Sequence, residues 1–230
     1  MQSLKRIGIS IGDLNGVGIE IALKAHETIK QLCHPLYFVD QSVAEQAAQL
    51  LNVLLPNDFE CVNLSSDSFT ITPGTVDAQS GRYSFHSFTK AVEYAQSGKI
   101  DAITTLPIHK EAWMIADVPF KGHTDALRSL LDSDAIMMLG CEELYVALYT
   151  EHIPLKEVAP SIQREPLKKF LHLLYKTTQE NSIAVLGLNP HAGDQGLLGD
   201  EEQNIIKPAI DKASAEGVFV AGPYGADGFF

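Results

Sequence analysis

Short apolar runs alternate along the chain with longer segments in which apolar residues recur every three or four positions. The short runs predict strands, and the longer repeats predict helices. The predicted strands cover residues 6–11, 36–39, 61–64, 69–72, 101–106, 135–139, 144–150, 182–188 and 218–221, with 61–64 and 69–72 the weakest. Helical periodicity is clearest over residues 80–97 and 201–216. Such alternation is typical of an α/β fold with a largely parallel sheet.

Local signals mark the ends and inner faces of several helices. The end signals are a capping box at Ser42–Glu45, a stop at Gly98, a cap at Thr124 for a helix to Leu131, Pro166 in a first turn, and a kink at Pro208. The expected inner faces are Ala22, Ala25, Ile29 and Leu32 after the first strand, and Leu167, Phe170, Leu171 and Leu174 after Arg164.

The length suits one large domain or two small ones, because 230 residues with 45% hydrophobic content can bury a sizeable core. The turn at 140–143 is the best candidate for a boundary, giving a first α/β lobe over 1–140 and a second over 141–230. The sequence ends on Phe229 and Phe230 without a closing helix, so we expect the second lobe to be incomplete there.

Charge and cysteine content narrow the class of protein. A formal net charge of −12 argues against nucleic acid and anionic membrane surfaces as partners, although a small anionic substrate needs only local donors. The odd, widely spaced cysteines Cys33, Cys61 and Cys141 predict buried thiols in a reducing compartment. The sequence shows neither a signal peptide nor a membrane-spanning run, so we expect a cytoplasmic protein.

Two histidines follow predicted strands directly. His152 comes after the strand over 144–150, and His191 lies in a glycine-rich loop after the strand over 182–188, between Pro190 and Gly193. Open α/β sheets bind ligands at such strand ends, and neutral imidazole is a common ligand of divalent metals. Taken singly, each is also typical of a hydrogen-bonded loop histidine. The acidic residues nearby, which either orient a ligand or only begin a helix, are Asp194, Asp200, Glu201 and Glu202.

Further candidates lie in the first half of the chain. Lys110, after His109 at a strand end, suits a phosphate or carboxylate, but a solvated lysine is the more common interpretation. His123 and Thr124 place an imidazole and a hydroxyl at a helix start, where they either position a substrate or form a simple cap. The glycine loop Gly12–Gly18 matches neither common nucleotide-binding motif and fits a ligand loop or a tight turn equally well.

Together these segments resemble the 4-hydroxythreonine-4-phosphate dehydrogenase family of vitamin B6 biosynthesis. The matching stretches, in the family's order, are residues 12–18, 106–110, 120–125, 150–155, 187–193 and 222–227. The resemblance implies a two-lobed, three-layer α/β/α fold with largely parallel sheets, like that of isocitrate and isopropylmalate dehydrogenases. It also implies a homodimer with the active site at the subunit interface.

The resemblance further implies an activity. The family oxidises 4-phosphooxy-L-threonine with NAD or NADP, and the product then loses CO2 to give 3-amino-2-oxopropyl phosphate. A divalent metal (zinc, magnesium or cobalt) is bound by three histidines drawn from both subunits. Such an ion acts as a Lewis acid on the substrate hydroxyl.

The family's functional residues map onto six positions of this sequence. His152 and His191 match two metal ligands, and His123 and Thr124 match a substrate-binding pair. Asp227 matches an active-site acid near the metal, and Lys110 is the second candidate catalytic residue. No position is assigned to the nicotinamide cofactor.

The chain also departs from the family pattern. The third metal histidine belongs to a His-Asp-Gln-Gly segment that these 230 residues do not contain, and Leu106 stands where the family has glycine. Two alternatives therefore stay open: a paralogue acting on threonate or erythronate 4-phosphate, and a non-catalytic small-molecule-binding module of the same fold. Substrate profiling separates the first from the dehydrogenase, and metal titration separates the second.

Overall fold

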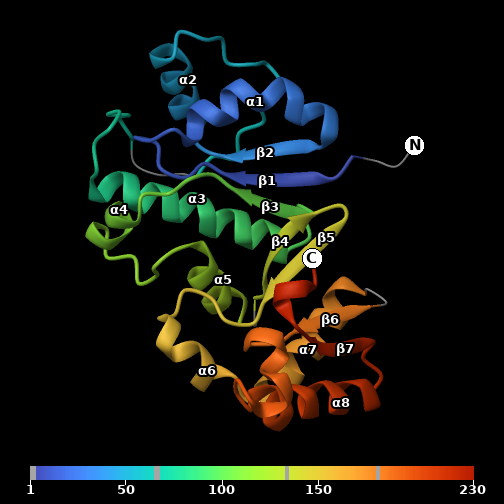
Figure 1. Ribbon diagram of the computed structural model, residues 1–230. Coiled ribbons are helices and arrows are strands. Elements are labelled where there is room, and N and C mark those ends of the chain that lie inside the picture. The colour runs from blue at the N-terminus through green and yellow to red at the C-terminus, as the bar shows by residue number, and fades with distance from the viewer. Residues whose placement is uncertain (1–3, 65–67, 133–134, 180–181) are drawn as a thin grey trace. The chain divides into compact units, whose positions relative to one another are not determined.

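The computed structural model describes residues 4–64, 68–132, 135–179 and 182–230 of the chain (Figure 1). The fold divides into two compact units, Met1–Ala135 and Ile136–Phe230. The predicted boundary at 140–143 falls instead on the turn of a β-hairpin inside the second unit, because β4 and β5 pair directly across it.

The first unit is built on a parallel sheet of β1 (Arg6–Ser10), β2 (His34–Phe38) and β3 (Ala102–Thr105), in the order β2-β1-β3. Helices α1 (Gly18–Leu32) and α2 (Gln41–Leu50) lie on one side of the strands, and α3 (Ala78–Gln96) and the short α4 (Lys110–Ile115) lie on the other (Figure 1). The chain moves from β1 to β2 and then returns past β1 to β3, so right-handed crossovers place the connecting helices on opposite sides of the sheet. The predicted α/β/α layering is confirmed here.

The buried face of α1 differs from the predicted one. The helix buries Gly18, Ile19, Ala22, Leu23 and His26. Ala22 is buried as predicted and Ile29 packs partly buried against the core, whereas Leu32, the last residue of the helix, is 74% exposed. The prediction for Leu32 is wrong, and the fully buried His26 is a polar member of this face that the apolar pattern did not include.

Residues 61–64 and 69–72 are not strands. Cys61 makes only a single bridge to Tyr37. Polar side chains bind the backbone N–H groups in place of a strand: Asp40 accepts from Leu64, and Asn15 accepts from Thr72. Because side chains bind these backbone N–H groups, the weak apolar runs at 61–64 and 69–72 do not pair as strands.

Two of the predicted helix caps are also wrong. Helix α2 begins at Gln41 with Asp40 as N-cap, so Ser42 and Glu45 do not form a capping box. Helix α5 (His123–Leu131) has Gly122 as N-cap, which places Thr124 inside the first turn. The stop at Gly98 is confirmed: α3 ends at Gln96, and Gly98 adopts a positive φ of 70°.

The second unit contains two separate pairs of strands. β4 (Met137–Cys141) and β5 (Leu144–Leu148) form an antiparallel hairpin, whereas β6 (Ile183–Leu186) and β7 (Val220–Tyr224) are parallel. The expectation of largely parallel pairing thus holds for the first unit but not for the hairpin. Helices α7 (Arg164–Thr178) and α8 (Lys207–Ala215) pack on each other and on β7, and α6 (Val158–Ser161) is short.

The predicted stripe of α7 is confirmed, since Leu167, Leu171 and Leu174 are buried and Phe170 is partly buried. The predicted kink at Pro208 takes another form. A π-helical turn, Glu202–Ile206, precedes α8, so Lys207 donates to Glu202 instead of to the residue four back. Pro208 has no N–H for the carbonyl of Asn204, and the Arg164 guanidinium donates to that carbonyl at 2.8 Å. The helix therefore continues through Pro208, and the carbonyl of Asn204 still accepts a hydrogen bond.

The cysteines are less buried than predicted. Cys33 and Cys61 are half-buried, and Cys141 at the end of β4 is exposed. Burial raises the pKa of the Cys61 thiol to about 12 and also raises that of Cys33, so both are protonated at neutral pH. Within the described residues, no helix is long and apolar enough to cross a membrane.

The glycine loop after β1 is a close backbone contact. Gly12 has a φ of 70°, and a Cβ there would lie 2.3 Å from the carbonyl oxygen of Pro107. The next residue, Asp13, donates its backbone N–H to the same carbonyl at 2.8 Å. At Gly18 a Cβ would lie 2.4 Å from the carbonyl oxygen of Ile11. Gly12 is thus required where the loop after β1 meets the loop after β3, and Gly18 where the start of α1 returns to the end of β1.

Asn15 in the same loop makes a buried polar link to the segment before α3. Its side chain accepts from the backbone of Thr72 at 2.9 Å and donates to the carbonyl of Thr75 at 3.0 Å and the carboxylate of Asp77 at 3.1 Å. All three partners belong to the chain itself. For Asn15 the structure therefore favours a tight turn over a ligand-binding loop.

Replacing Asn15 should therefore cost stability. We expect Asn15→Ala to lower the free energy of unfolding by about 2–3 kcal/mol, because it leaves buried donors and acceptors without partners. Urea unfolding followed by circular dichroism measures this change. The exposed Asn57→Ala is the matched control and should change it by less than about 0.5 kcal/mol. Equal stabilities for the two variants would contradict the assignment.

Candidate functional site

The six predicted site residues are divided between the two units. Lys110, His123 and Thr124 lie in the first unit, and His152, His191 and Asp227 lie in the second. Each group is described within its own unit.

In the first unit the candidates gather at the starts of α4 and α5. His109 is the N-cap of α4, and Lys110 is its first residue. The Lys110 Cε lies 3.8 Å from where a Cβ of Gly122 would stand, which brings the lysine beside the start of α5. His123 and Thr124 are the first two residues of that helix. We refer to His109, Lys110, His123 and Thr124, at these two neighbouring helix starts, as the first-unit cluster.

The His123 ring is held by aromatic side chains. Its centroid lies 4.9 Å from that of Phe88 and 5.6 Å from that of Trp113, whose indole N–H donates to Ser84. Burial lowers the pKa of the His123 imidazole, so the ring is neutral at pH 7. The surrounding rings fix its position without any charge.

Two imidazole nitrogens in this cluster are buried without a hydrogen-bond partner among the described residues. They are Nε2 of His123 and Nδ1 of His109. Buried polar atoms are normally paired, so unpaired ones point to a ligand or ordered water. With the Lys110 ammonium and the Thr124 hydroxyl nearby, the cluster suits an anionic, hydroxyl-bearing molecule. From sequence, His109 stands out only by its place at a strand end before Lys110.

In the second unit, His191 and Asp227 are brought together although 36 residues separate them. The His191 Nδ1 lies 2.6 Å from Oδ2 of Asp227, and the His191 backbone N–H donates to Oδ1 at 3.4 Å. Gly225 allows this approach, because a Cβ there would lie 2.8 Å from Oδ1 of Asp227. Asp227 thus fixes both the backbone and the ring of His191. Because the Asp227 carboxylate accepts a hydrogen bond from Nδ1, this nitrogen carries the proton of the neutral ring. The lone pair of Nε2 then stays available for a ligand.

The backbone that carries His191 is unusual. Residues His191, Ala192, Gly193, Asp194 and Gln195 all have positive φ, between 43° and 81°, so the chain makes a left-handed turn. Left-handed conformation costs about 1–2 kcal/mol for each residue with a side chain. Such a run persists only where surrounding contacts hold it, and strain of this kind is characteristic of functional sites.

His152 is less constrained. It has a φ of 52°, its side chain is 74% exposed, and its Nδ1 lies 3.8 Å from a carboxylate oxygen of Glu151. Among the described residues, neither His152 nor His191 belongs to a set of three metal-ligating side chains.

The set of three that does occur is His26, Glu27 and Asp58, which the sequence did not single out. Lys30 already places its ammonium 2.9 Å from each of the two carboxylates. Both ring nitrogens of His26 are also engaged, Nδ1 with the Tyr37 hydroxyl at 2.9 Å and Nε2 with Asp58 at 3.1 Å. Lysine supplies the positive charge that a metal would supply, so this cluster is structural.

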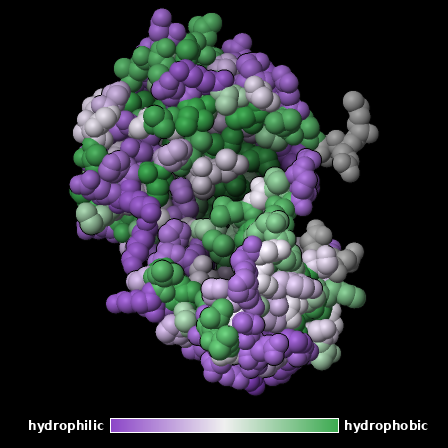
Figure 2. Space-filling view, viewed as in Figure 1, coloured by the Kyte–Doolittle hydropathy of each residue, from purple (hydrophilic) through white to green (hydrophobic). Residues whose placement is uncertain are grey.

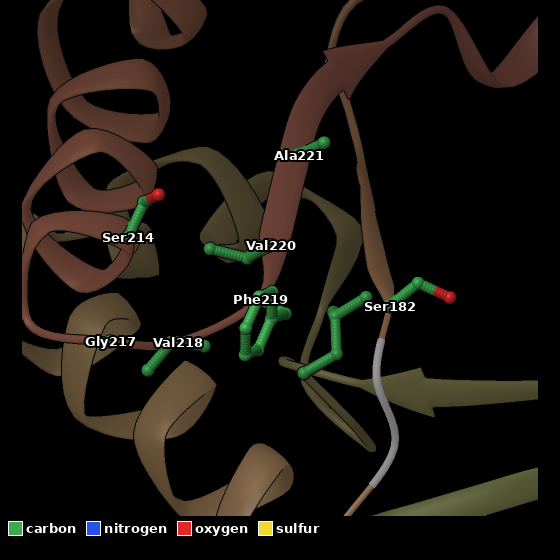
Figure 3. Close-up of a pocket in the computed structure, with 8 residues that line it drawn as sticks. Ser182, Ser214, Gly217, Val218, Phe219, Val220 and Ala221 are labelled. Atoms are coloured by element: carbon green, nitrogen blue, oxygen red, sulfur yellow. The ribbon is translucent and has the colours of Figure 1, made fainter.

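A surface hollow of about 430 Å³ lies elsewhere in the second unit (Figure 3). Its lining includes Ser182 and Ile183 at the start of β6 and Phe219 and Val220 at the start of β7. His191 and Asp227 follow the opposite ends of these strands, where parallel sheets bind their ligands. The hollow is therefore not the candidate site.

Comparison with known proteins agrees with the predicted resemblance. A family model described as pyridoxal phosphate biosynthetic protein PdxA matches residues 31–230. Curated 4-hydroxythreonine-4-phosphate dehydrogenases of Sulfurimonas denitrificans and Helicobacter pylori (strain P12) are 51% and 44% identical, over 93% and 98% of this chain and 69% and 76% of their own length.

Solved structures agree on the fold. A 4-hydroxythreonine-4-phosphate dehydrogenase from Burkholderia phymatum has a TM-score of 0.86 and 32% identity, covering 98% of this chain and 76% of that one. The predicted fold class and family resemblance are thus confirmed. The chain belongs to the family of pyridoxal phosphate biosynthetic protein PdxA.

Proposed function

We propose that the chain carries the site of an NAD(P)-dependent, metal-assisted 4-hydroxythreonine-4-phosphate dehydrogenase. The reaction oxidises 4-phosphooxy-L-threonine at its secondary hydroxyl, and decarboxylation then yields 3-amino-2-oxopropyl phosphate for pyridoxal phosphate biosynthesis. The names of relatives at 44–51% identity support this activity.

The observation that carries the proposal is the pairing of His191 with Asp227. A carboxylate on one ring nitrogen is the usual companion of a metal-binding histidine, because it fixes the tautomer and aims the other nitrogen. The His191 side chain is 71% exposed, which leaves room for a ligand at the ring. These features fit a divalent ion such as zinc, magnesium or cobalt, with His152 as a second ligand.

The role of Asp227 follows from the same contact. Its carboxylate is held by His191, so Asp227 acts by orienting that ligand rather than as a free acid. A divalent ion held there by His191 would supply a Lewis acid for the substrate hydroxyl.

Within the first unit, the cluster suits a phosphorylated, hydroxyl-bearing ligand. His123 offers a neutral, buried Nε2 to a polar group, and Thr124 offers a hydroxyl at the start of α5. Lys110, expected to be catalytic, is exposed and supplies positive charge to the phosphate or carboxylate. In a chain with a formal net charge of −12, such a local cation would favour the binding of an anion.

A homodimer is the second part of the proposal, and the β4–β5 hairpin supports it. Leu139 is 59% exposed and Tyr145 60% exposed, and they lie on opposite faces of the hairpin because Leu139 pairs with Val146 and Tyr145 with Gly140. Figure 2 shows apolar surface over this hairpin. A lone two-stranded hairpin is marginally stable in water, so a second copy that covers it would stabilise it.

Removing the proposed ligand should abolish metal binding. We expect His191→Ala to lose cobalt binding in isothermal titration calorimetry and to lower kcat/KM by about 1,000-fold. Asp227→Asn should weaken cobalt affinity by about 10–100-fold, since the ring loses its orientation. His34→Ala, at an exposed histidine outside the site, is the control. Wild-type cobalt affinity in His191→Ala would refute the metal assignment.

The neutral state of His123 predicts a dependence of stability on pH. Its pKa in the folded protein lies below the unfolded value of 6.5, so below pH 6.5 the unfolded state binds more protons at this site. The neutral ring therefore makes its full contribution to the free energy of unfolding above pH 6.5. This contribution decreases as the pH falls towards the pKa of His123 in the folded protein. Urea unfolding at pH 7.5 and 5.5 should show a smaller loss in His123→Gln than in the wild type. An equal loss would contradict burial of His123.

The same variant tests the substrate role. We expect His123→Gln to lower kcat/KM for 4-phosphooxy-threonine by about 10–100-fold while the affinity for NAD changes little. Unchanged kinetics would count against a substrate contact. Equal wild-type turnover of threonate 4-phosphate would assign the chain to the paralogue instead.

The dimer is tested by light scattering after gel filtration. We expect the wild type at about twice the chain mass of 25.1 kDa and Leu139→Lys at the monomer mass. Leu54→Lys, at a 93% exposed leucine of the first unit, is the matched control and should remain dimeric. A monomeric wild type, or a dimeric Leu139→Lys, would contradict this role of the hairpin.

A further inference from the structure

Glu202 is the most buried carboxylate of the second unit's described residues, with 2% of its surface exposed. Nothing in the family resemblance gives it a task, and from sequence it is equally typical of a solvated helix start. Its burial at the first position of the π-helical turn Glu202–Ile206 rules out the solvated interpretation.

The carboxylate of Glu202 binds the residue from which the left-handed turn begins. Its Oε1 accepts the backbone N–H of Asn189 at 2.7 Å, and its Oε2 accepts the side-chain amide of Asn189 at 2.9 Å. Asn189 is the residue before the turn Pro190–Gly196, so these bonds fix the point at which the chain enters it.

The same carboxylate also contacts the turn itself. A Cβ on Gly193 would lie 2.8 Å from Oε2, and a Cβ on Gly187 would lie 3.1 Å from Oε1. Glu202 thus occupies space that only glycine leaves open, on both sides of His191 in the sequence. The Glu202 carboxylate therefore lies against the chain at three places: at Gly187 after β6, at Asn189 before the turn, and at Gly193 within it.

We infer that Glu202 is a positioning residue for His191: by holding Asn189 and Gly193 it keeps the left-handed turn in the conformation that presents the His191 ring to Asp227. This inference rests on the proposed role of His191 as a metal ligand. Its chemistry requires a pure acceptor, because both Asn189 groups are donors and a carboxylate has no proton to oppose them.

Glu202→Gln tests this requirement with almost no change of shape. The glutamine places an NH₂ group opposite one of the two Asn189 donors. One of the two hydrogen bonds to Asn189 is then lost, and the left-handed turn is held less firmly. Glu201→Gln is the matched control: Glu201 is the neighbouring residue, accepts the same Asn189 amide at 2.8 Å, and undergoes the same charge change.

The first readout needs no metal. Nitrogen-15 NMR of the imidazole in the full chain reports which ring nitrogen of His191 is protonated. We expect the Nδ1-protonated form in the wild type and in Glu201→Gln, and a mixture of tautomers in Glu202→Gln. If Glu202→Gln only destabilised the fold, the imidazole resonances of other histidines would change together with those of His191. The resonances of His26 therefore serve as the internal reference.

The second readout is cobalt affinity by calorimetry, which should fall at least about 10-fold in Glu202→Gln and less than about threefold in Glu201→Gln. Should Glu202→Gln fail to fold, Asn189→Ala removes the side-chain bond while keeping the backbone bond, and it should show the same shifts at smaller size. Wild-type tautomer and cobalt affinity in the folded variant would overturn the inference.

The parent proposal fails differently. If His191→Ala bound cobalt as the wild type does, His191 would not be a ligand, yet the tautomer measurement would still decide whether Glu202 positions its ring.

Discussion

Parallel strands end at a common edge, and this constraint places the candidate chemistry of both units. In the first unit, β1 and β3 run in the same direction, and the loops after them meet where Asp13 donates to the carbonyl of Pro107. In the second unit, β6 and β7 are parallel, and the loops after them bring His191 to Asp227. Residues far apart in sequence thus become neighbours because of strand direction alone.

Buried polar groups then determine which of these neighbours are structural. Asn15 and the His26 cluster have protein partners for their polar atoms, and Lys30 supplies the charge that the acidic side chains need. His109 and His123 differ, because each keeps a buried nitrogen without a partner in the described part of the chain. Satisfied groups stabilise the fold, whereas unsatisfied groups carry a cost that a ligand can remove.

Much of the fold was predictable from sequence. Periodicity located α3 and the buried stripe of α7, because each packs one continuous apolar face. It failed where side chains replaced backbone pairing: Asp40 accepts from the N–H of Leu64, and Asn15 accepts from that of Thr72. It also missed the π-helical turn before Pro208, since the partner of the freed carbonyl, Arg164, is 40 residues away.

The candidate site shows the same division. Local motifs marked His191, His123 and Lys110, but no local pattern shows that Asp227 holds His191 or that Glu202 is buried beneath its turn. These are long-range contacts that only the folded backbone creates. If His191 offers Nε2 to a divalent ion, crystals of the chain soaked in cobalt should bind the ion at this ring. Anomalous X-ray scattering should then show a cobalt peak about 2.0–2.2 Å from Nε2 of His191. A peak at the His26 cluster, or none near His191, would contradict this role of His191.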